Sequence, residues 1–175
     1  MRKVLYILGQ LSDSDVDWLA RSGKRIKALK GTQLIKLGVS LSNLYIILDG
    51  ALSVQTNKGF ELAKVSSGEI IGEMSLVDSR PPSASVVVLQ DTFVLALDKA
   101  VLQQKLDSDD GFSSRFYRAI AIFLSERMRT TVSRMGYGDP NDEEPEDADE
   151  LDANVLDNVH LAGARFERLL KKLMG

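Results

Sequence analysis

The chain has no cysteine and a single histidine, and both shortages limit its chemistry. Without thiols it cannot form disulfides, iron–sulfur clusters or cysteine zinc sites, and the absence fits a reducing compartment. The one histidine, His160, lies between Val159 and Leu161 in a helical pattern, with no nucleophile or acid beside it in a recognisable motif. We therefore expect no metal site and no enzyme activity.

Long apolar runs are also missing. Near the N-terminus the apolar run at residues 4–8 ends at Gly9, which makes it too short for the core of a signal peptide. No later run is long enough to cross a bilayer. These features predict a cytoplasmic protein that does not insert into membranes.

Charge is distributed unevenly over the 175 residues, whose formal net charge is −3. Between residues 139 and 152, nine of fourteen positions are acidic and none is basic, which leaves 22 basic and 16 acidic side chains elsewhere. Pro140 and Pro145 argue against a continuous helix there. We interpret 139–152 as a solvated acidic linker. The alternative is an acidic arm that docks on a basic surface.

From residue 25 to 97 the pattern is that of short strands separated by glycine turns. Residues 44–48 are apolar at every position, which predicts a strand buried on both faces. The sequence Asn57-Lys58-Gly59 is typical of a hairpin turn. Many short strands at this spacing predict an antiparallel β-roll or jelly roll, and flanking helices make the fold class α+β.

A long amphipathic helix is predicted at about residues 112–135, after a short helix at 99–105 and a break at 107–111. Its apolar residues recur at steps of three and four and extend beyond what one small β-roll can cover. We therefore predict a coiled-coil homodimer contact through five of them, Phe116, Ile120, Phe123, Leu124 and Met128. The alternative is that the whole stripe packs on its own β-roll.

The tail, residues 151–173, is predicted to form a second amphipathic helix with basic residues near its C-terminal end. It packs either on this protein's own body or dimer partner, or on another protein or an anionic surface. The resulting division is an N-terminal helical segment at 1–23, a β-roll with two helices at 24–138, the acidic linker at 139–152 and the tail helix at 153–175.

Three stretches in this order resemble the cyclic nucleotide-binding domain family, the sensor of catabolite-activator-type regulators. They are residues 44–50 (LYIILDG), 67–76 (SGEIIGEMSL) and 80–86 (RPPSASV), and the resemblance extends over residues 11–136. It implies a pocket for a small anionic ligand, with cAMP or another cyclic nucleotide as the candidate. A helix N-terminus suits the phosphate, and the resemblance gives Glu73 to the ribose hydroxyl. The implied ligand-binding residues are Ile71, Gly72, Glu73, Met74, Ser75, Arg80, Pro82, Ser83, Ala84 and Thr131.

One position departs from the family pattern. The family has an arginine that pairs with the phosphate nine residues after the glutamate, and this chain has Pro82 there. Loss of such a buried charge-assisted pair costs about 2–5 kcal/mol. Arg80 is the local replacement candidate, although two consecutive prolines orient residues 80 and 82 differently.

Direct DNA binding is not expected, because only 37 residues follow Gly138 and the first fourteen are the acidic strip, whereas a helix-turn-helix needs two helices. Two hypotheses remain. The chain is either a ligand sensor that reports to a partner protein through its C-terminal helices, or an interaction and dimerisation module that has lost nucleotide binding. Glu73 favours the first, and Pro82 favours the second or a changed ligand.

Overall fold

The computed structural model describes residues 7–78, 80–134 and 153–174, so the acidic strip at 139–152 lies outside the described residues. The strands are β1 (Lys24–Ala28), β2 (Gln33–Ile35), β3 (Asn43–Asp49), β4 (Ala51–Gln55), β5 (Glu61–Ser66), β6 (Ile70–Ile71), β7 (Ser85–Val88) and β8 (Thr92–Asp98). The helices are α2 (Asp13–Ser22), α3 (Met74–Val77), α4 (Lys99–Ser108), α5 (Asp110–Arg134) and α6 (Ala153–Met174).

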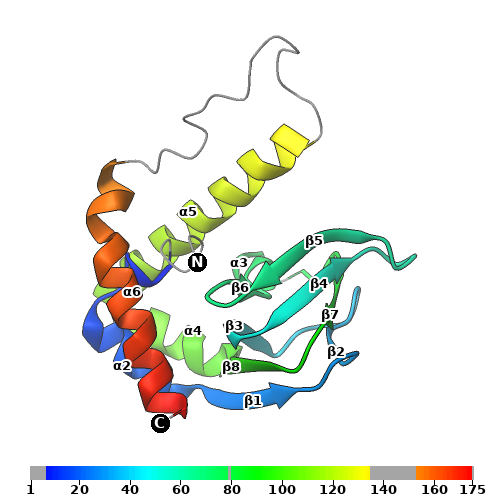
Figure 1. Cartoon of the computed structure of the whole chain (residues 1–175). Coiled ribbons are helices and arrows are strands. Elements are labelled where there is room, and N and C mark those ends of the chain that lie inside the picture. The colour runs from blue at the N-terminus through cyan, green and yellow to red at the C-terminus, as the bar shows by residue number, and fades with distance from the viewer. Residues whose placement is uncertain (1–6, 79, 135–152, 175) are drawn as a thin grey trace.

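The strands form two antiparallel sheets of four strands each, in the orders β1-β8-β3-β6 and β2-β7-β4-β5. Figure 1 shows the β-roll on one side of the molecule and α2, α5 and α6 on the other. The predicted α+β class with an antiparallel jelly roll is confirmed. None of the helices in the described ranges combines the length and apolarity that a membrane crossing requires.

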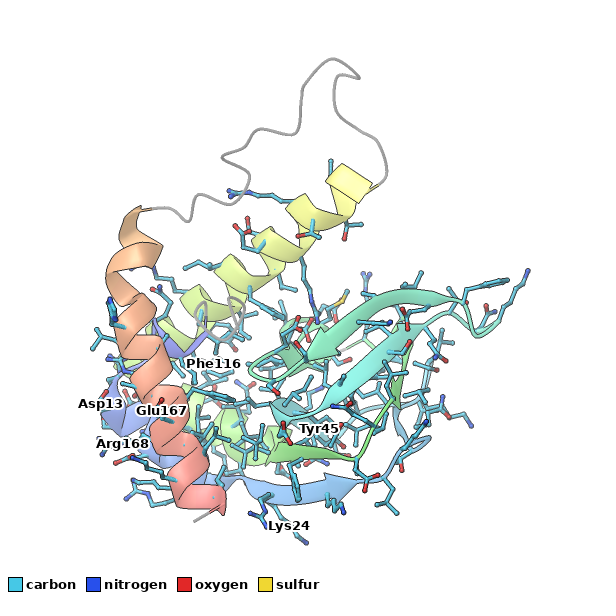
Figure 2. All side chains as sticks on the ribbon, viewed as in Figure 1. Asp13, Lys24, Tyr45, Phe116, Glu167 and Arg168 are labelled. Atoms are coloured by element: carbon cyan, nitrogen blue, oxygen red, sulfur yellow. The ribbon has the colours of Figure 1, made fainter. Side chains whose placement is uncertain are left out.

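The central strand β3 separates two apolar cores, because successive side chains of a strand point to opposite faces. Tyr45 and Ile47 face the core between the sheets, together with residues such as Leu52 and Val86. Leu44, Ile46 and Leu48 face the helices. Figure 2 shows Tyr45 within the β-roll and Phe116 on the helical side. The prediction that this strand is buried on both faces is confirmed.

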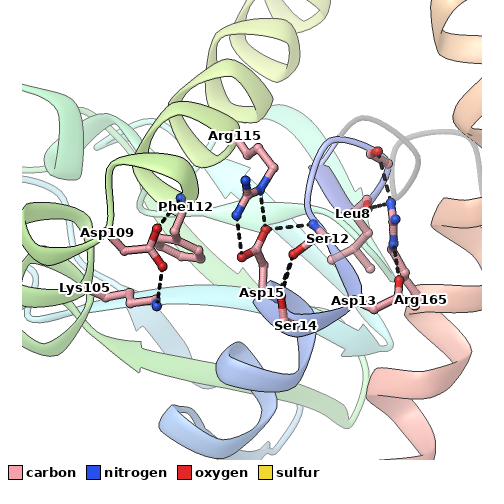
Figure 3. A network of polar contacts seen from close by, with 11 residues as sticks. Leu8, Ser12, Asp13, Ser14, Asp15, Lys105, Asp109, Phe112, Arg115 and Arg165 are labelled. Carbon is pink, nitrogen blue, oxygen red and sulfur yellow. Dashed lines mark hydrogen bonds and ion pairs between the residues drawn. The ribbon is translucent and has the colours of Figure 1, made fainter.

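Helix α2 is anchored at both its cap and its buried face. The Ser12 hydroxyl accepts from the amide of Asp15, and the Asp15 carboxylate accepts from the amide of Ser12, which makes a capping box. Arg115 of α5 donates two hydrogen bonds to the same carboxylate, at 2.7 and 3.0 Å (Figure 3). The Trp18 ring packs edge-on against Phe112, 5.3 Å between centroids. These contacts join α2 to α5.

The predicted break between the two helices after β8 is shorter than expected. Helix α4 continues to Ser108 and α5 begins at Asp110, so only Asp109 separates them. The reason is the Asp109 side chain, whose carboxylate accepts from the amide of Phe112 at 2.9 Å and from Lys105 at 2.7 Å (Figure 3). A capped turn allows α5 to start before Gly111.

Helix α5 is buried in its first half and exposed toward its end. Phe116, Ile120 and Phe123, three of the five residues predicted to contact a second chain, are buried in this chain's own core and are not available to a partner in this arrangement. Leu124 is half-buried against the same core. Met128 keeps 66% of its surface exposed. Only the later part of the stripe therefore extends beyond the chain's own body.

The tail helix α6 packs on the body of its own chain beside α2 (Figure 1). Ala162 and Leu169 are fully buried in the core that α2, α4 and α5 also line. Arg165 and Arg168 face the acids of α2. Of the two placements predicted for the tail, the structure shows the intramolecular one.

Candidate functional site

The candidate site lies where β6 turns into α3. Strand β6 pairs with β3, with Ile71 opposite Tyr45. The chain then turns at Gly72 and enters α3 at Met74, so the side chain of Glu73 is held at a fixed junction. The segment that follows α3 leads to β7, and α5 provides a side chain from the helical layer. Four separate elements therefore converge on one place.

A cavity of about 220 Å³ opens there. Nine of the ten ligand-binding candidates from the sequence line it: Ile71, Gly72, Glu73, Met74, Ser75, Arg80, Pro82, Ser83 and Ala84. The remaining lining residues are Ile35, Val54, Asp78, Pro81, Val86 and Arg127. Because both apolar strand residues and charged residues line it, the cavity is suitable for a small ligand with both kinds of surface.

The centre of the site is a buried ion pair. Glu73 has only 2% of its surface exposed, and its Oε1 lies 2.5 Å from Nη1 of Arg127. The same guanidinium donates to the carbonyl of Ile70 at 3.3 Å and stacks 4.5 Å from the centroid of the Phe123 ring. Arg127 is thus oriented by three contacts, and it connects the β-roll to α5.

Burial raises the pKa of the Glu73 carboxyl above its ordinary value, because removal from water disfavours the charged form, and the positive charge of Arg127 offsets part of this rise. A buried carboxylate of this kind is costly without its partner. Any ligand that engages either residue must therefore replace the contact that it breaks.

The segment after α3 presents its arginine differently from the expected phosphate contact. The amide of Arg80 donates to Asp78, and its guanidinium lies 3.8 Å from the same carboxylate while 83% of the side chain is exposed. The carbonyl of Pro82 accepts from the amide of Gly38 at 2.9 Å, which fixes this part of the backbone to the turn after β2. Pro82 lines the cavity but carries no charge that could pair with a phosphate.

The charges that line the cavity balance each other. Glu73 faces Arg127, and Asp78 faces Arg80. Each cation already has a carboxylate partner, so an incoming anion has to compete for it. This arrangement differs from a pocket with a dedicated phosphate arginine, where the cation has no such competitor.

Gly72 is required here for reasons of backbone geometry. Its φ is 89°, in the region that side chains disfavour, and a Cβ would lie 2.6 Å from Cδ2 of Leu41 and 3.2 Å from the carbonyl of Asn43. The expected close approach to a ligand stays a prediction. The glycine is explained by the turn itself.

Sequence reasoning placed Thr131 near the ligand and missed Arg127. Thr131 is exposed, is not among the lining residues, and its hydroxyl donates to the carbonyl of Arg127 at 2.8 Å. The signal for Arg127 was available, because it lies four residues after Phe123 and four before Thr131 on the apolar stripe of a helix. A charged residue in such a stripe indicates a buried partner.

Comparisons with known proteins agree with this fold. Residues 25–109 match the family profile described as the cyclic nucleotide-binding domain. A cyclic nucleotide-binding domain from Methylobacillus flagellatus, solved by crystallography, superimposes with a TM-score of 0.70 at 29% identity, covering 77% of this chain and 82% of that one. The matched segment and the shared fold identify residues 25–109 as a cyclic nucleotide-binding domain.

Two relatives show the contexts in which this domain occurs. The Pycsar effector protein XpPycTIR of Xanthomonas perforans is 28% identical over 117 residues, which are 66% of this chain and 38% of that protein. A cAMP-dependent protein kinase regulatory subunit of Debaryomyces hansenii is 30% identical over 124 residues, which are 71% of this chain and 25% of that protein. This chain thus spans well under half the length of either relative.

Proposed function

We propose that this chain is a regulatory protein without catalytic activity, which binds a cyclic nucleotide or related anionic ligand weakly and signals through its C-terminal helices to a partner protein. The observation that carries the proposal is the Glu73–Arg127 pair in the cavity wall. Because Glu73 belongs to the β-roll and Arg127 to α5, a ligand that engages the pair changes the contact between these two parts.

The chemistry of the pair suits a ligand that has hydroxyl and anionic groups side by side. A carboxylate accepts hydrogen bonds from hydroxyls, and a guanidinium donates to anionic oxygens. A ribose hydroxyl on Glu73 and a phosphate oxygen on Arg127 or Arg80 would satisfy both residues. The relative named as a cAMP-dependent kinase regulatory subunit supports cAMP as the first candidate, with cGMP second.

Weak binding follows from the charge balance of the cavity. Both arginines are already paired with carboxylates, and Pro82 brings no cation. Part of the energy from any new contact must offset the contact that is lost.

Isothermal titration with cAMP and cGMP tests the proposal. We expect Pro82→Arg to tighten cAMP binding at least 30-fold, because a charge-assisted contact to the phosphate contributes about 2–5 kcal/mol. Pro81→Arg, which adds the same charge at the neighbouring position, is the matched control and should change affinity much less. Glu73→Ala should abolish binding by wild type and by Pro82→Arg, and its melting temperature shows whether the fold is retained.

The alternative is an interaction and dimerisation module that has lost its ligand, and the departure at Pro82 favours it. No heat from wild type, with binding restored in Pro82→Arg, would support this alternative and refute a competent sensor. Wild-type binding tighter than about 10 µM that is lost in Glu73→Ala would refute the alternative.

The homodimer also belongs to the proposal, with a narrower contact than the sequence predicted. Leu124 is half-buried, and Met128 and Val132 remain exposed near the end of α5, where a second copy of the helix could pack. The cytoplasmic location expected from the cysteine-free sequence stays a prediction.

A further inference from the structure

A dense set of polar contacts joins α6 to the N-terminal part of the chain. The side chain of Arg165 is only 14% exposed, and its guanidinium donates to the Asp13 carboxylate at 2.8 Å and to the carbonyls of Leu8 and Gly9 (Figure 3). Arg168 makes two hydrogen bonds to Asp17, at 2.8 and 2.7 Å.

Two further contacts lie at the C-terminal end of α6. Lys172 lies 2.6 Å from the carboxylate of Asp17, which also accepts from Arg168. Arg25 donates to the carbonyl of Leu173 at 2.6 Å. In each ion pair between the described side chains of the two helices, the acid is on α2 and the base is on α6.

The contact also has an apolar part. Within the part of α6 whose side chains are described, Ala162 and Leu169 are fully buried, and Phe166, Leu170 and Leu173 are partly buried. The ion pairs around them differ in exposure: the side chains of Asp13 and Arg168 keep 61% and 45% of their surface exposed, whereas those of Arg165 and Asp17 keep 14% and 20%. Figure 2 shows Asp13 and Arg168 on the facing sides of the two helices. Such pairs are weakened by salt.

The docking of α6 on its own chain is an intramolecular binding event. Eighteen residues, 135–152, connect it to α5. A tethered helix docks at a high effective concentration, so that individually weak contacts suffice and a competitor of the same chemistry can displace it. The hydrogen bonds from Arg168 and Lys172 lower the pKa of Asp17 to about 2, so this acid stays charged over the physiological range.

We propose that the face of α2 that carries Asp13 and Asp17 is a docking surface for a basic amphipathic helix, that α6 is its displaceable occupant, and that a partner protein presents a helix of the same chemistry. The partner helix needs basic residues at the spacing of Arg165, Arg168 and Lys172, beside an apolar stripe. The docked α6 then acts as an intramolecular competitor for the partner. This inference does not depend on the ligand of the Glu73 cavity.

Hydrogen exchange of the full chain tests whether α6 can undock. We expect Arg168→Glu/Lys172→Glu to speed exchange of α6 at least fivefold and to leave β3 unchanged. Lys171→Glu, on the exposed part of the same helix, is the matched control and should have little effect. Adding Asp17→Lys to the double variant should restore most of the protection, because the ion pairs re-form with reversed signs. Loss of protection in β3 together with α6 would show that α6 is an integral part of the fold and would overturn the proposal.

A labelled peptide of residues 153–174 tests whether the surface accepts a helix from another molecule. We expect it to bind the Arg168→Glu/Lys172→Glu chain at least tenfold more tightly than wild type, whose surface is occupied by α6, and to bind more weakly as salt is raised. Equal affinity for the two chains, or no binding to the double variant, would refute an exchangeable docking surface.

Discussion

Removal of the Arg127 guanidinium gives the sharpest test of the site. In Arg127→Met the carboxylate of Glu73, 2% exposed, loses the partner 2.5 Å away while the helix keeps an apolar side chain of similar length. Breaking a buried pair from one side typically costs about 3–5 kcal/mol. Because the Arg127 side chain is 31% exposed, we expect the lower end, about 3 kcal/mol, including the contact with Phe123.

Urea unfolding at pH 7 measures this loss, and a double-mutant cycle assigns it to the pair. Glu73→Gln/Arg127→Met buries no charge, so it should be more stable than Arg127→Met by at least 1 kcal/mol. If Arg127→Met loses less than about 0.5 kcal/mol, the pair does not have the role that its geometry indicates.

The same variant has a pH dependence of predictable sign. Burial already raises the pKa of Glu73 above its model-peptide value, and loss of Arg127 raises it further. Where the folded pKa is the higher one, the folded state binds more protons, and stability falls as pH rises through the folded pKa. Arg127→Met should therefore gain stability as pH is lowered from 8 toward about 4.5, relative to Glu73→Gln/Arg127→Met. Parallel pH profiles for the two variants would contradict this reasoning.

Three more outcomes are expected. Gly72→Ala should lower stability by about 1–3 kcal/mol in thermal unfolding, and by more than Gly59→Ala, because both glycines have positive φ but a Cβ meets other atoms only at Gly72. Asp15→Asn should cost about 1.5–3 kcal/mol of stability and remove part of the acid sensitivity below pH 3.8. Burial raises the pKa of Asp15, but the hydrogen bonds from Arg115 and the helix cap lower it by more, so the net pKa is below the ordinary value. Stability that comes from a lowered pKa is lost as the pH falls through that pKa. If α5 forms a homodimer, light scattering at tens of micromolar should give a dimer mass that Met128→Glu reduces to the monomer.

Much of the fold could be predicted from the sequence because its signals are local. The apolar run at 44–48 indicates a strand buried on two faces, and the structure uses both faces. The glycine before Glu73 indicates a turn, and its φ of 89° explains why a glycine is there. Helix limits were less predictable. The α4–α5 junction depends on contacts of Asp109 with Lys105 and Phe112, and in the sequence a capping aspartate cannot be told from any other aspartate.

Only the part of the candidate site that comes from the β-roll could be predicted from the sequence, and the pairing with the arginine from α5 could not. The segments that hold Glu73 and Pro82 lie close together along the chain, so their spacing could be compared with the family pattern. Arg127 lies 54 residues from Glu73, and no periodicity states which acid an arginine on a helix will meet. The predicted dimer stripe is ambiguous for the same reason, because Phe116, Ile120 and Phe123 look identical in sequence whether they face a second chain or, as here, their own core.

The sequence by itself determined the absence of thiol chemistry, the β-roll with its helices, and the proline in place of an expected cation, since each depends on residue identity or short-range pattern. Only the tertiary structure decided which charges meet. It pairs Glu73 with Arg127 across 54 residues, Asp15 with Arg115 across 100, and Asp17 with Arg168 across 151. An ion pair forms only when its two charges lie a few ångströms apart in space. The number of residues between them in the sequence does not give this distance, which is set only when the strands and helices pack.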